Sequence, residues 1–350
     1  MLAMPTAPRP RHQFASDNTA AICPEAWAAL AEANHDAAVS YADDLWTERV
    51  RRQVREIFEK NCETFLVFNG TAANALALAQ LCRPFESTLC HFHAHIETDE
   101  CGAPEFFGGG SKLLLVGGEN GKLDLAQATA VLGQHRDVHS TRVRAVSVTQ
   151  STEAGTVYSF SELDAIADFA ARNSLALHMD GARFANAVAS LGCRPKEITW
   201  ERGVDVLSFG GTKNGTAGGE LVLFFKTELA REFEYRVKQG AQLASKTRFL
   251  AAQWTGLLAN DSWLKNARHA NEMARRLEEE LRAAGLALTF PRQANAVFVR
   301  LPNDVAEILH ARGWHFYNFF APGVYRLMCS WATTAPEIDE FMADCQTALR

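Results

Sequence analysis

The sequence predicts an α/β protein in which a large domain, built on a mostly parallel central sheet covered by helices, precedes a smaller C-terminal α+β domain. Its 350 residues fit one large domain with a smaller companion. Between about residues 60 and 230, short apolar runs typical of buried strands alternate with helical patterns. From about residue 257, a long amphipathic helix is followed by short elements. We therefore expect a flexible tail over 1–13, a large domain over 14–256 whose first segment can pack on the small domain, and a small domain over 257–350.

The elements predicted for the large domain follow in chain order. An apolar strand over residues 64–68 precedes a Gly-Thr pair, and the Ala/Leu-rich residues 72–81 favour a helix. Ser159 and Glu162 have the spacing of a capping box, which predicts the start of a helix that runs through residue 171. The same alternation predicts helices over 125–134 and 183–191, and strands over 87–90, 112–116, 144–149, 175–179, 204–209 and 220–225.

The small domain begins with a long helix. Residues 263–284 carry an apolar stripe at helical spacing, and Gly285 is a typical stop signal for such a helix. Shorter patterns after it predict strands over 296–301 and 324–328, and helices over 305–312 and 336–349. This mixture of long helices and few strands predicts an α+β arrangement.

Composition excludes several classes of protein. Hydrophobic residues make up 47% of the chain and charged residues 22%, which excludes disorder as its main state. The net charge is −6 and no basic stripe is present, so we expect no nucleic-acid partner. The apolar runs are shorter than the roughly 20 residues of a membrane span. The eight cysteines form no CxxC pair and indicate a reducing compartment, for which the cytoplasm is the expected location.

An acid and a lysine follow two of the predicted strands. Asp180 lies at the end of the strand predicted over 175–179, and Lys213 lies just past the strand predicted over 204–209, among glycines. Strand ends of this kind form the ligand crevice of an open α/β sheet. The two residues suit pyridoxal 5′-phosphate (PLP), which needs a lysine to hold its aldehyde as a Schiff base and an anion beside its pyridine nitrogen. Either residue alone is better interpreted as an ordinary surface residue, but the pair favours chemistry.

A third segment can bind the phosphate of such a cofactor. Gly70 and Thr71 stand between a predicted strand and a predicted helix, where backbone N–H groups and a hydroxyl suit a phosphate group. Alone, the segment is equally typical of a turn and a helix cap. The absence of a GxGxxG motif disfavours a nicotinamide cofactor.

Three histidines alternate along a short polar stretch. His91, His93 and His95 have the spacing of metal ligands on one strand face, but no second ligand group accompanies them, and we expect no metal site. We favour the interpretation that one of these histidine rings stacks on the cofactor. The other two are then structural residues held by hydrogen bonds.

The sequence resembles the L-threonine aldolase family, within the β-eliminating lyases of the aspartate-aminotransferase-like PLP fold. The resemblance runs from about Phe14 to the C-terminus, is closest to the bacterial low-specificity members, and extends to phenylserine aldolases. It rests on five motifs in a common order: FASDN at 14–18, FNGTAAN at 68–74, TDECGAPEFF at 98–107, HMDGARF at 178–184 and FGGTKNG at 209–215.

The resemblance implies a PLP cofactor and assigns it six residues, of which Arg183 is also a candidate substrate ligand. Lys213 matches the Schiff-base lysine and Asp180 the partner of the pyridinium. Gly70 and Thr71 match the phosphate-binding cup. His95 matches the histidine that stacks on the ring and acts on the substrate hydroxyl.

The resemblance also implies substrate contacts and subunit partners. Arg183 and Arg326 match arginines that hold the substrate carboxylate and the hydroxyl side of the cofactor. Ser16 matches a contact to the carboxylate, and Tyr41 aligns with a tyrosine near the site. Homodimers or homotetramers with shared active sites are implied. The basic residues of 235–248 are a candidate phosphate contact to a neighbouring subunit, although a solvated face is favoured.

One departure from the family concerns the base. Many members carry a histidine in an ENTH-type segment, where this chain has Thr-Gln-Ser-Thr-Glu at 149–153. His95, or a water that it holds, therefore becomes the expected base for the β-hydroxyl. A set of aromatic residues is a candidate pocket for the aldehyde: Tyr41, Trp46, Phe106, Phe107 and Trp331.

The expected reaction is the retro-aldol cleavage of L-threonine, L-allo-threonine and related L-3-hydroxy amino acids to glycine and an aldehyde. The main alternatives are a phenylserine aldolase, or another PLP-dependent lyase or aminotransferase. A metal-dependent hydrolase built on the three histidines and a non-catalytic cofactor-binding protein are the alternatives from other classes.

Overall fold

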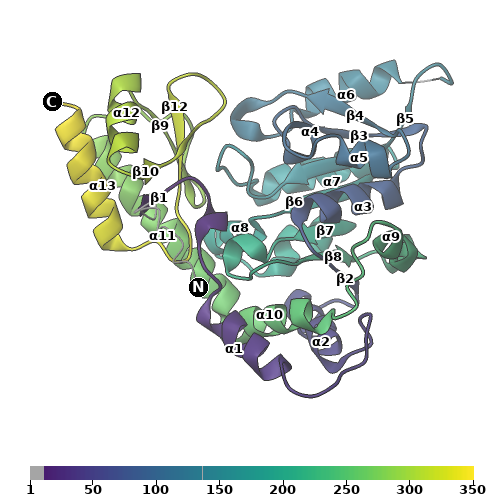
Figure 1. The fold of residues 1–350 in the computed structure, drawn as a ribbon. Helices are drawn as coiled ribbons and strands as arrows, with labels where there is room; N and C mark the ends of the chain where they lie inside the picture. The colour runs from purple at the N-terminus through teal and green to yellow at the C-terminus, as the bar shows by residue number, and fades with distance from the viewer. Residues whose placement is uncertain (1–11, 136) are drawn as a thin grey trace, which may run out of the picture.

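The computed structural model describes residues 12–135 and 137–350. Figure 1 shows a large domain around a central sheet and, beside it, a smaller domain made by about the C-terminal quarter of the chain. This is the mixed α/β architecture that the sequence predicts.

The central sheet has seven strands in the order β2-β8-β7-β6-β5-β3-β4. Strand β8 is antiparallel to both of its neighbours, and the pairs from β7 to β4 are all parallel. The prediction of a mostly parallel sheet is thus confirmed. The strands are β2 (Glu63–Val67), β3 (Glu86–His91), β4 (Lys112–Val116), β5 (Arg142–Thr149), β6 (Ala176–Gly181), β7 (Val206–Phe209) and β8 (Glu220–Phe224).

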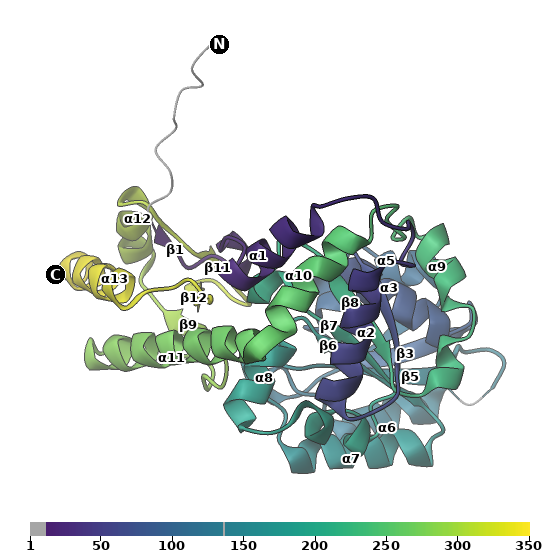
Figure 2. The same ribbon diagram turned by 90° about the horizontal axis from the view of Figure 1, so that it is seen from below.

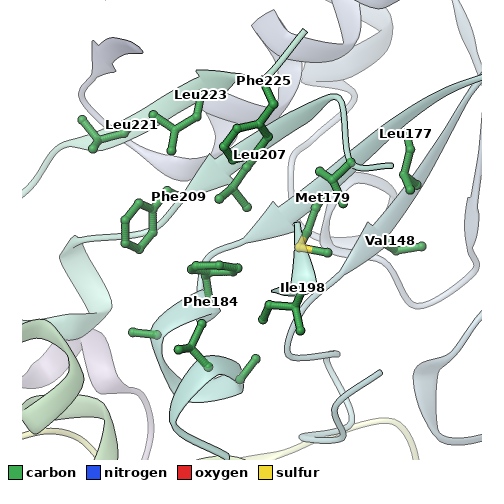
Figure 3. Close-up of a cluster of buried hydrophobic side chains, with 14 of the residues drawn as sticks. Val148, Leu177, Met179, Phe184, Ile198, Leu207, Phe209, Leu221, Leu223 and Phe225 are labelled. Atoms are coloured by element: carbon green, nitrogen blue, oxygen red, sulfur yellow. The ribbon is translucent and has the colours of Figure 1, made fainter. Parts of the chain in front are cut away.

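Helices cover both faces of this sheet because successive strand residues face opposite sides. On one face, Ala176, Val206 and Val222 pack with α3 (Gly70–Leu81) and α9 (Phe233–Gln239). On the other face the alternate residues pack with α2 (Leu45–Phe58), α7 (Phe160–Arg172) and α8 (Phe184–Leu191), and Figure 3 shows part of that core, including Leu177, Leu207 and Leu223. The remaining helices of the large domain are α1 (Pro24–Ala33), α4 (His95–Thr98), α5 (Ala103–Phe107), α6 (Leu125–Gln134) and α10 (Arg248–Leu258).

Local signals in the sequence locate several element ends correctly. The capping box at Ser159 and Glu162 begins α7, with each side chain bonded to the other residue's backbone N–H. The bounds of β4 and α6 agree with the predicted 112–116 and 125–134. Helices α1, α2, α4, α5, α9 and α10 are not predicted. In α2 the buried residues Val50, Val54 and Phe58 recur at helical spacing in a charged segment, an amphipathic pattern from which this helix could be predicted.

The small domain combines helices with short strands, as predicted. Its main sheet is antiparallel with the order β11-β12-β9, and a second, parallel pair joins β1 to β10. Its elements are α11 (Ser262–Ala283), β9 (Ala296–Arg300), α12 (Asn303–Ala311), β10 (Trp314–His315), β11 (Tyr317–Asn318), β12 (Val324–Met328) and α13 (Ala335–Ala348).

Helix α11 joins the two domains. Trp263 and Ala267, near its start, belong to the core of the large domain, whereas Leu277 and Leu281 belong to the core of the small domain. Figure 2 shows this helix running from the edge of the large domain, next to α8, into the small domain. The predicted boundary between residues 256 and 257 falls in the last turn of α10.

The N-terminal segment packs on the small domain. Most of the tail predicted over 1–13 lies outside the described residues, but His12–Gln13 forms β1, which pairs with β10. Phe14 follows it, fully buried, with its ring 5.7 Å from that of Trp314 and 5.2 Å from that of Phe341. Aromatic packing of Phe14 therefore holds the N-terminal segment against the small domain before the chain enters the large domain.

Replacing Phe14 by alanine tests this attachment. Phe14→Ala leaves a cavity between two aromatic rings and is expected to lower the free energy of unfolding by about 3–5 kcal/mol. Val138→Ala, at a side chain that is 97% exposed, is the control, with a change within about 0.5 kcal/mol. Chemical denaturation measures both, and an equal effect of the two variants would contradict the role of Phe14.

Candidate active site

The predicted site residues meet at the carboxyl ends of the parallel strands. Asp180 ends β6, Lys213 lies in a short 3-10 helix (Thr212–Asn214) after β7, and His95 begins α4. These three residues and the start of α3 line one cleft of about 320 Å³. Asp180 has the same strand parity as Ala176, which places it on the face of the sheet that α3 covers.

The N-terminus of α3 offers free backbone amides to this cleft. The first turn of a helix has N–H groups without intrahelical partners, and here the side chain of Asn69 accepts only that of Ala72, at 2.9 Å. Gly70 and Thr71 both line the cleft. A Cβ atom on Gly70 would meet no atom within 4 Å, so a ligand can approach the backbone closely. The helix dipole adds to these donors and favours an anion.

Lys213 has an amine suited to covalent chemistry. Its Nζ makes no hydrogen bond to any described residue. Burial, followed by the positive charge of Arg183, lowers the pKa of Lys213, which favours the neutral, nucleophilic amine. The backbone before it is held by Glu220, whose carboxylate accepts the N–H of Gly211 at 2.5 Å and the hydroxyl of Thr212 at 2.6 Å.

Asp180 is fixed by two donors. Its Oδ1 accepts the N–H of Ala182 at 2.9 Å, and its Oδ2 accepts the side-chain amide of Asn74, also at 2.9 Å. The same amide nitrogen donates to Glu100 Oε1 at 2.8 Å, and that oxygen lies 2.9 Å from Nδ1 of His95. One amide thus connects the acid of β6 to the histidine of α4 through a buried carboxylate.

This network sets the protonation of His95. Its hydrogen bond to Glu100 raises the pKa of His95 above the usual range, although burial opposes that shift. Because Nδ1 is held by Glu100, Nε2 is the ring nitrogen without a partner among the described residues. The imidazole can therefore offer Nε2 to a molecule in the cleft.

The predicted substrate-binding residues border an adjoining cleft of about 440 Å³. Ser16, Arg183 and Arg326 line it together with Lys213 and His95. Nη2 of Arg326 donates to the carbonyl of residue 15 at 3.1 Å, while its Nε is buried and has no partner among the described residues. Burial lowers the pKa of Arg326 to about 10, so the guanidinium stays charged at neutral pH.

Arg183 differs from Arg326 because its planar fork is already engaged. Its Nε and Nη2 donate to the two carboxylate oxygens of Asp17, at 2.7 and 2.8 Å. Burial alone would raise the pKa of Asp17, but Arg183 lowers it, so the pair is ionic. Sequence analysis assigns Arg183 to the substrate or cofactor and does not foresee this partner.

Tyr41 lines none of the clefts described here. It is 51% exposed on the loop between α1 and α2, and Lys238 Nζ stands 4.8 Å from the centre of its ring. The other aromatic residues expected around an aldehyde also line none of the clefts described here: Trp46, Phe106, Phe107 and Trp331. The aromatic side chains that do line them are Phe68, Tyr317 and Phe319.

The three histidines do not converge. His91 Nε2 lies 3.1 Å from the carbonyl of Gly118, and the ring of His93 contacts Phe320 at 4.4 Å. Only His95 faces the cleft. Among the described residues no group of three His, Cys, Asp or Glu side chains could hold a metal ion.

Several residues of the site escape sequence analysis. Asp17, Asn74 and Glu100 stand inside the recognised motifs, but their roles depend on partners distant in the chain. Glu153, in the loop after β5, and Glu220, at the start of β8, also carry buried carboxyl groups. For Glu220, the available signal is a charged residue at the start of an otherwise apolar strand.

Fold and site together define the class of protein. A mostly parallel sheet covered by helices on both faces, beside a smaller α+β domain, is the fold of the aspartate-aminotransferase-like enzymes. Solved structures that share the fold include an alanine–glyoxylate aminotransferase from Nostoc, with a TM-score of 0.72 at 14% identity over 100% of this chain and 98% of that one. The family model of the beta-eliminating lyases matches residues 13–304, and the chain belongs to this family.

Its relatives within the family are threonine aldolases. The chain is 53% identical to the low specificity L-threonine aldolase of Pseudomonas aeruginosa, over 96% of this chain and 98% of that protein. It is 51% identical to the enzyme of the same name from another Pseudomonas strain, with the same coverage. The threonine aldolase of Leishmania major superposes with a TM-score of 0.92 at 27% identity, over 97% of this chain and 100% of that one.

Replacing Glu100 by glutamine tests the network. Glu100→Gln removes the negative partner of Nδ1, so the pKa of the His95 imidazole is expected to fall, because the protonated form loses its stabilising charge. Nuclear magnetic resonance titration of the histidine ring protons measures this shift. Glu97→Gln, at an exposed carboxyl group in the same helix, is the control. An unchanged His95 titration in Glu100→Gln would show that Glu100 does not set this pKa.

Proposed function

We propose that this protein is a PLP-dependent aldolase that cleaves L-threonine, L-allo-threonine and related L-3-hydroxy amino acids to glycine and an aldehyde. The observation that carries the proposal is the meeting of Lys213, Asp180 and the N-terminus of α3 at one cleft. Two relatives that share more than half of their residues with the chain are named low specificity L-threonine aldolases. Their names support this function over the phenylserine-directed alternative.

The residues around the cleft fit PLP. The free amine of Lys213 would bind the cofactor aldehyde, and Asp180 would pair with the protonated pyridine nitrogen. The amides of Gly70 and Thr71, with the threonine hydroxyl, would bind the phosphate, and His95 would cover the ring. In the structure, a ligand can approach the backbone of Gly70 closely, because a Cβ atom there would meet no other atom. The carboxylate of Asp180 is held in place by its hydrogen bonds from Asn74 and Ala182.

The protein's part in the reaction is to orient the amino acid and to move protons. When bound, PLP supplies an electron-accepting ring for the pair of the breaking Cα–Cβ bond. Arg326, with its unpaired Nε, binds the α-carboxylate, and Ser16 lies beside it in the same cleft. The bound Asp17 keeps Arg183 in place, so that Arg183 contributes positive charge without a free fork. His95 offers Nε2 to the β-hydroxyl of the substrate.

Low specificity at Cβ follows from this arrangement. A group that contacts only the hydroxyl need not distinguish the two configurations at the carbon that carries it. The expected consequence is turnover of both threonine and allo-threonine.

We also propose assembly into a homodimer or homotetramer with active sites at the subunit junctions. Large apolar side chains are exposed on the described surface, including Phe68, which lines the cleft, and Phe106 and Tyr235, which do not. Such exposure is typical of surfaces that a partner covers.

None of the helices formed by the described residues is long and apolar enough to cross a membrane. The free state of all eight cysteines supports a cytoplasmic location.

The lysine variant tests the proposed cofactor and reaction together. Lys213→Ala removes the only amine placed to bind the PLP aldehyde among the residues that line the cleft, so kcat for L-threonine is expected to fall by at least about a hundredfold. The visible absorbance of lysine-bound PLP should disappear as well. Assays for glycine plus aldehyde, and for ammonia plus keto acid, identify the reaction. An unchanged absorbance band in Lys213→Ala, or release of ammonia by the native protein, would contradict the proposal.

The arginine variant tests the substrate site separately. Arg326→Lys keeps the charge but loses the planar fork, and KM for L-threonine is expected to rise about tenfold or more while PLP stays bound. Steady-state kinetics and the PLP absorbance measure the two effects. A KM equal to that of the native protein would exclude Arg326 as the carboxylate ligand.

A further inference from the structure

Only one of the two carboxyl oxygens of Glu153 has hydrogen-bond partners among the described residues. Its Oε1 accepts the backbone N–H of His95 at 2.8 Å and the hydroxyl of Thr149 at 2.9 Å. Its Oε2 is buried and has no partner among the described residues. An unpaired oxygen of a buried carboxyl group is costly, and such an atom in an otherwise well-bonded site calls for a ligand or a proton.

The position of Glu153 joins the two halves of the site. It lines the small cavity that it shares with Asp180 and Lys213, and it also lines the cleft that contains Arg326 and Ser16. A substrate whose amine is directed to Lys213 and whose carboxylate is bound by Arg326 therefore lies against Glu153. Sequence analysis finds no histidine in this segment, and the structure places a carboxyl group there instead.

The surroundings of Glu153 suit proton exchange near neutral pH. Burial, and then the negative charge of Asp180, raise the pKa of Glu153 to about 7. A base works best when its pKa lies near the working pH. The titratable or charged groups that surround it are His95, Asp180, Arg183 and Lys213 at the clefts, with Tyr158 and Cys90 behind.

His95 favours donating a hydrogen bond, whereas ionised Glu153 accepts a proton. The hydrogen bond from Glu100 raises the pKa of His95 and so favours its protonated form, which donates a hydrogen bond rather than accepting a proton. The carboxylate of Glu153 is an acceptor only. The two groups are joined because the His95 backbone is bound to Glu153 Oε1.

We propose that Glu153 is a catalytic residue whose Oε2 accepts the proton of the substrate β-hydroxyl during cleavage of the Cα–Cβ bond, while His95 donates a hydrogen bond to the same oxygen. This inference rests on the proposed aldolase function. It replaces His95 by Glu153 as the base and leaves His95 as a substrate-binding group.

The step balances in protons and electrons. The O–H pair of the β-hydroxyl becomes the second C–O bond of the aldehyde, and its proton goes to Glu153. The pair of the broken Cα–Cβ bond is left at Cα, where bound PLP would supply the electron-accepting ring, and a proton from solvent added at Cα completes glycine. Glu153 then releases its proton to solvent, so that no net proton is gained or lost.

The decisive experiment separates chemistry at the hydroxyl from chemistry at Cα. Glu153→Gln keeps the size of the side chain, and its amide oxygen can still accept from His95 and Thr149. Exchange of the Cα proton of glycine with D2O needs the cofactor and the substrate site but no β-hydroxyl. Glu153→Gln is expected to slow L-threonine cleavage by about a hundredfold or more and to leave PLP binding and glycine exchange within about threefold. Glu97→Gln, exposed on α4, should leave both rates unchanged.

The possible outcomes are distinct. Cleavage at the native rate in Glu153→Gln, or an equal loss of glycine exchange, would overturn the assignment of Glu153 while leaving the aldolase function intact. A native protein that neither binds PLP nor exchanges glycine would instead contradict the proposed function, and the inference with it.

A second variant keeps the carboxyl group. Thr149→Val removes one donor to Oε1 and so is expected to raise the pKa of Glu153 by about 1 unit. Because the base must be ionised, the acid limb of the pH profile of cleavage should move to higher pH by the same amount. Infrared difference spectra of the PLP-free protein should show a protonated carboxyl band that titrates near pH 7 and is absent from Glu153→Gln. An acid limb that does not move, or an infrared band that persists in Glu153→Gln, would overturn the proposal.

Discussion

The parallel pairing of β6 and β7 is the constraint on which the site depends. In this register Asp180 stands opposite Ser208, and Gly181 opposite Phe209, so the acid and the loop that carries Lys213 leave the sheet side by side. Buried apolar residues on both faces hold the two strands in place, as the cluster in Figure 3 illustrates. A shift of one residue would turn Asp180 to the opposite face of the sheet and away from α3.

Charged side chains gather around this constraint. Five carboxyl groups and three cationic side chains, all buried or half-buried, surround the clefts: Asp17, Glu100, Glu153, Asp180 and Glu220, with Arg183, Lys213 and Arg326. Ion pairing satisfies some of them, as in Arg183 with Asp17, and backbone or amide donors satisfy others. Burial lowers the pKa of Lys213 and raises the pKa of Glu153 to about 7. Such shifts are typical of catalytic sites.

The sequence predicts the sheet and the chemistry at its edge better than it predicts the contacts among site residues. The capping box before α7 and the apolar strands are local signals, and Asp180 and Lys213 are visible because each directly follows a strand. The contacts of Asn74 join residues 26 and 106 positions apart, and Arg183 meets Asp17 across 166 positions. Those contacts form only when α3 and the N-terminal segment pack against the sheet, so no local pattern reveals them. Helix α2 is a different case, because Val50, Val54 and Phe58 form an apolar stripe opposite charged residues, and this local amphipathic pattern is sufficient to predict a helix.

The account depends most on covalent attachment of PLP at the lysine beside β7. Borohydride reduction of the PLP-treated protein, followed by peptide mass spectrometry, locates that attachment directly. The account predicts a single phosphopyridoxyl group on the peptide that contains Lys213, in an amount close to one per chain. Attachment to another lysine, or none at all, would contradict it.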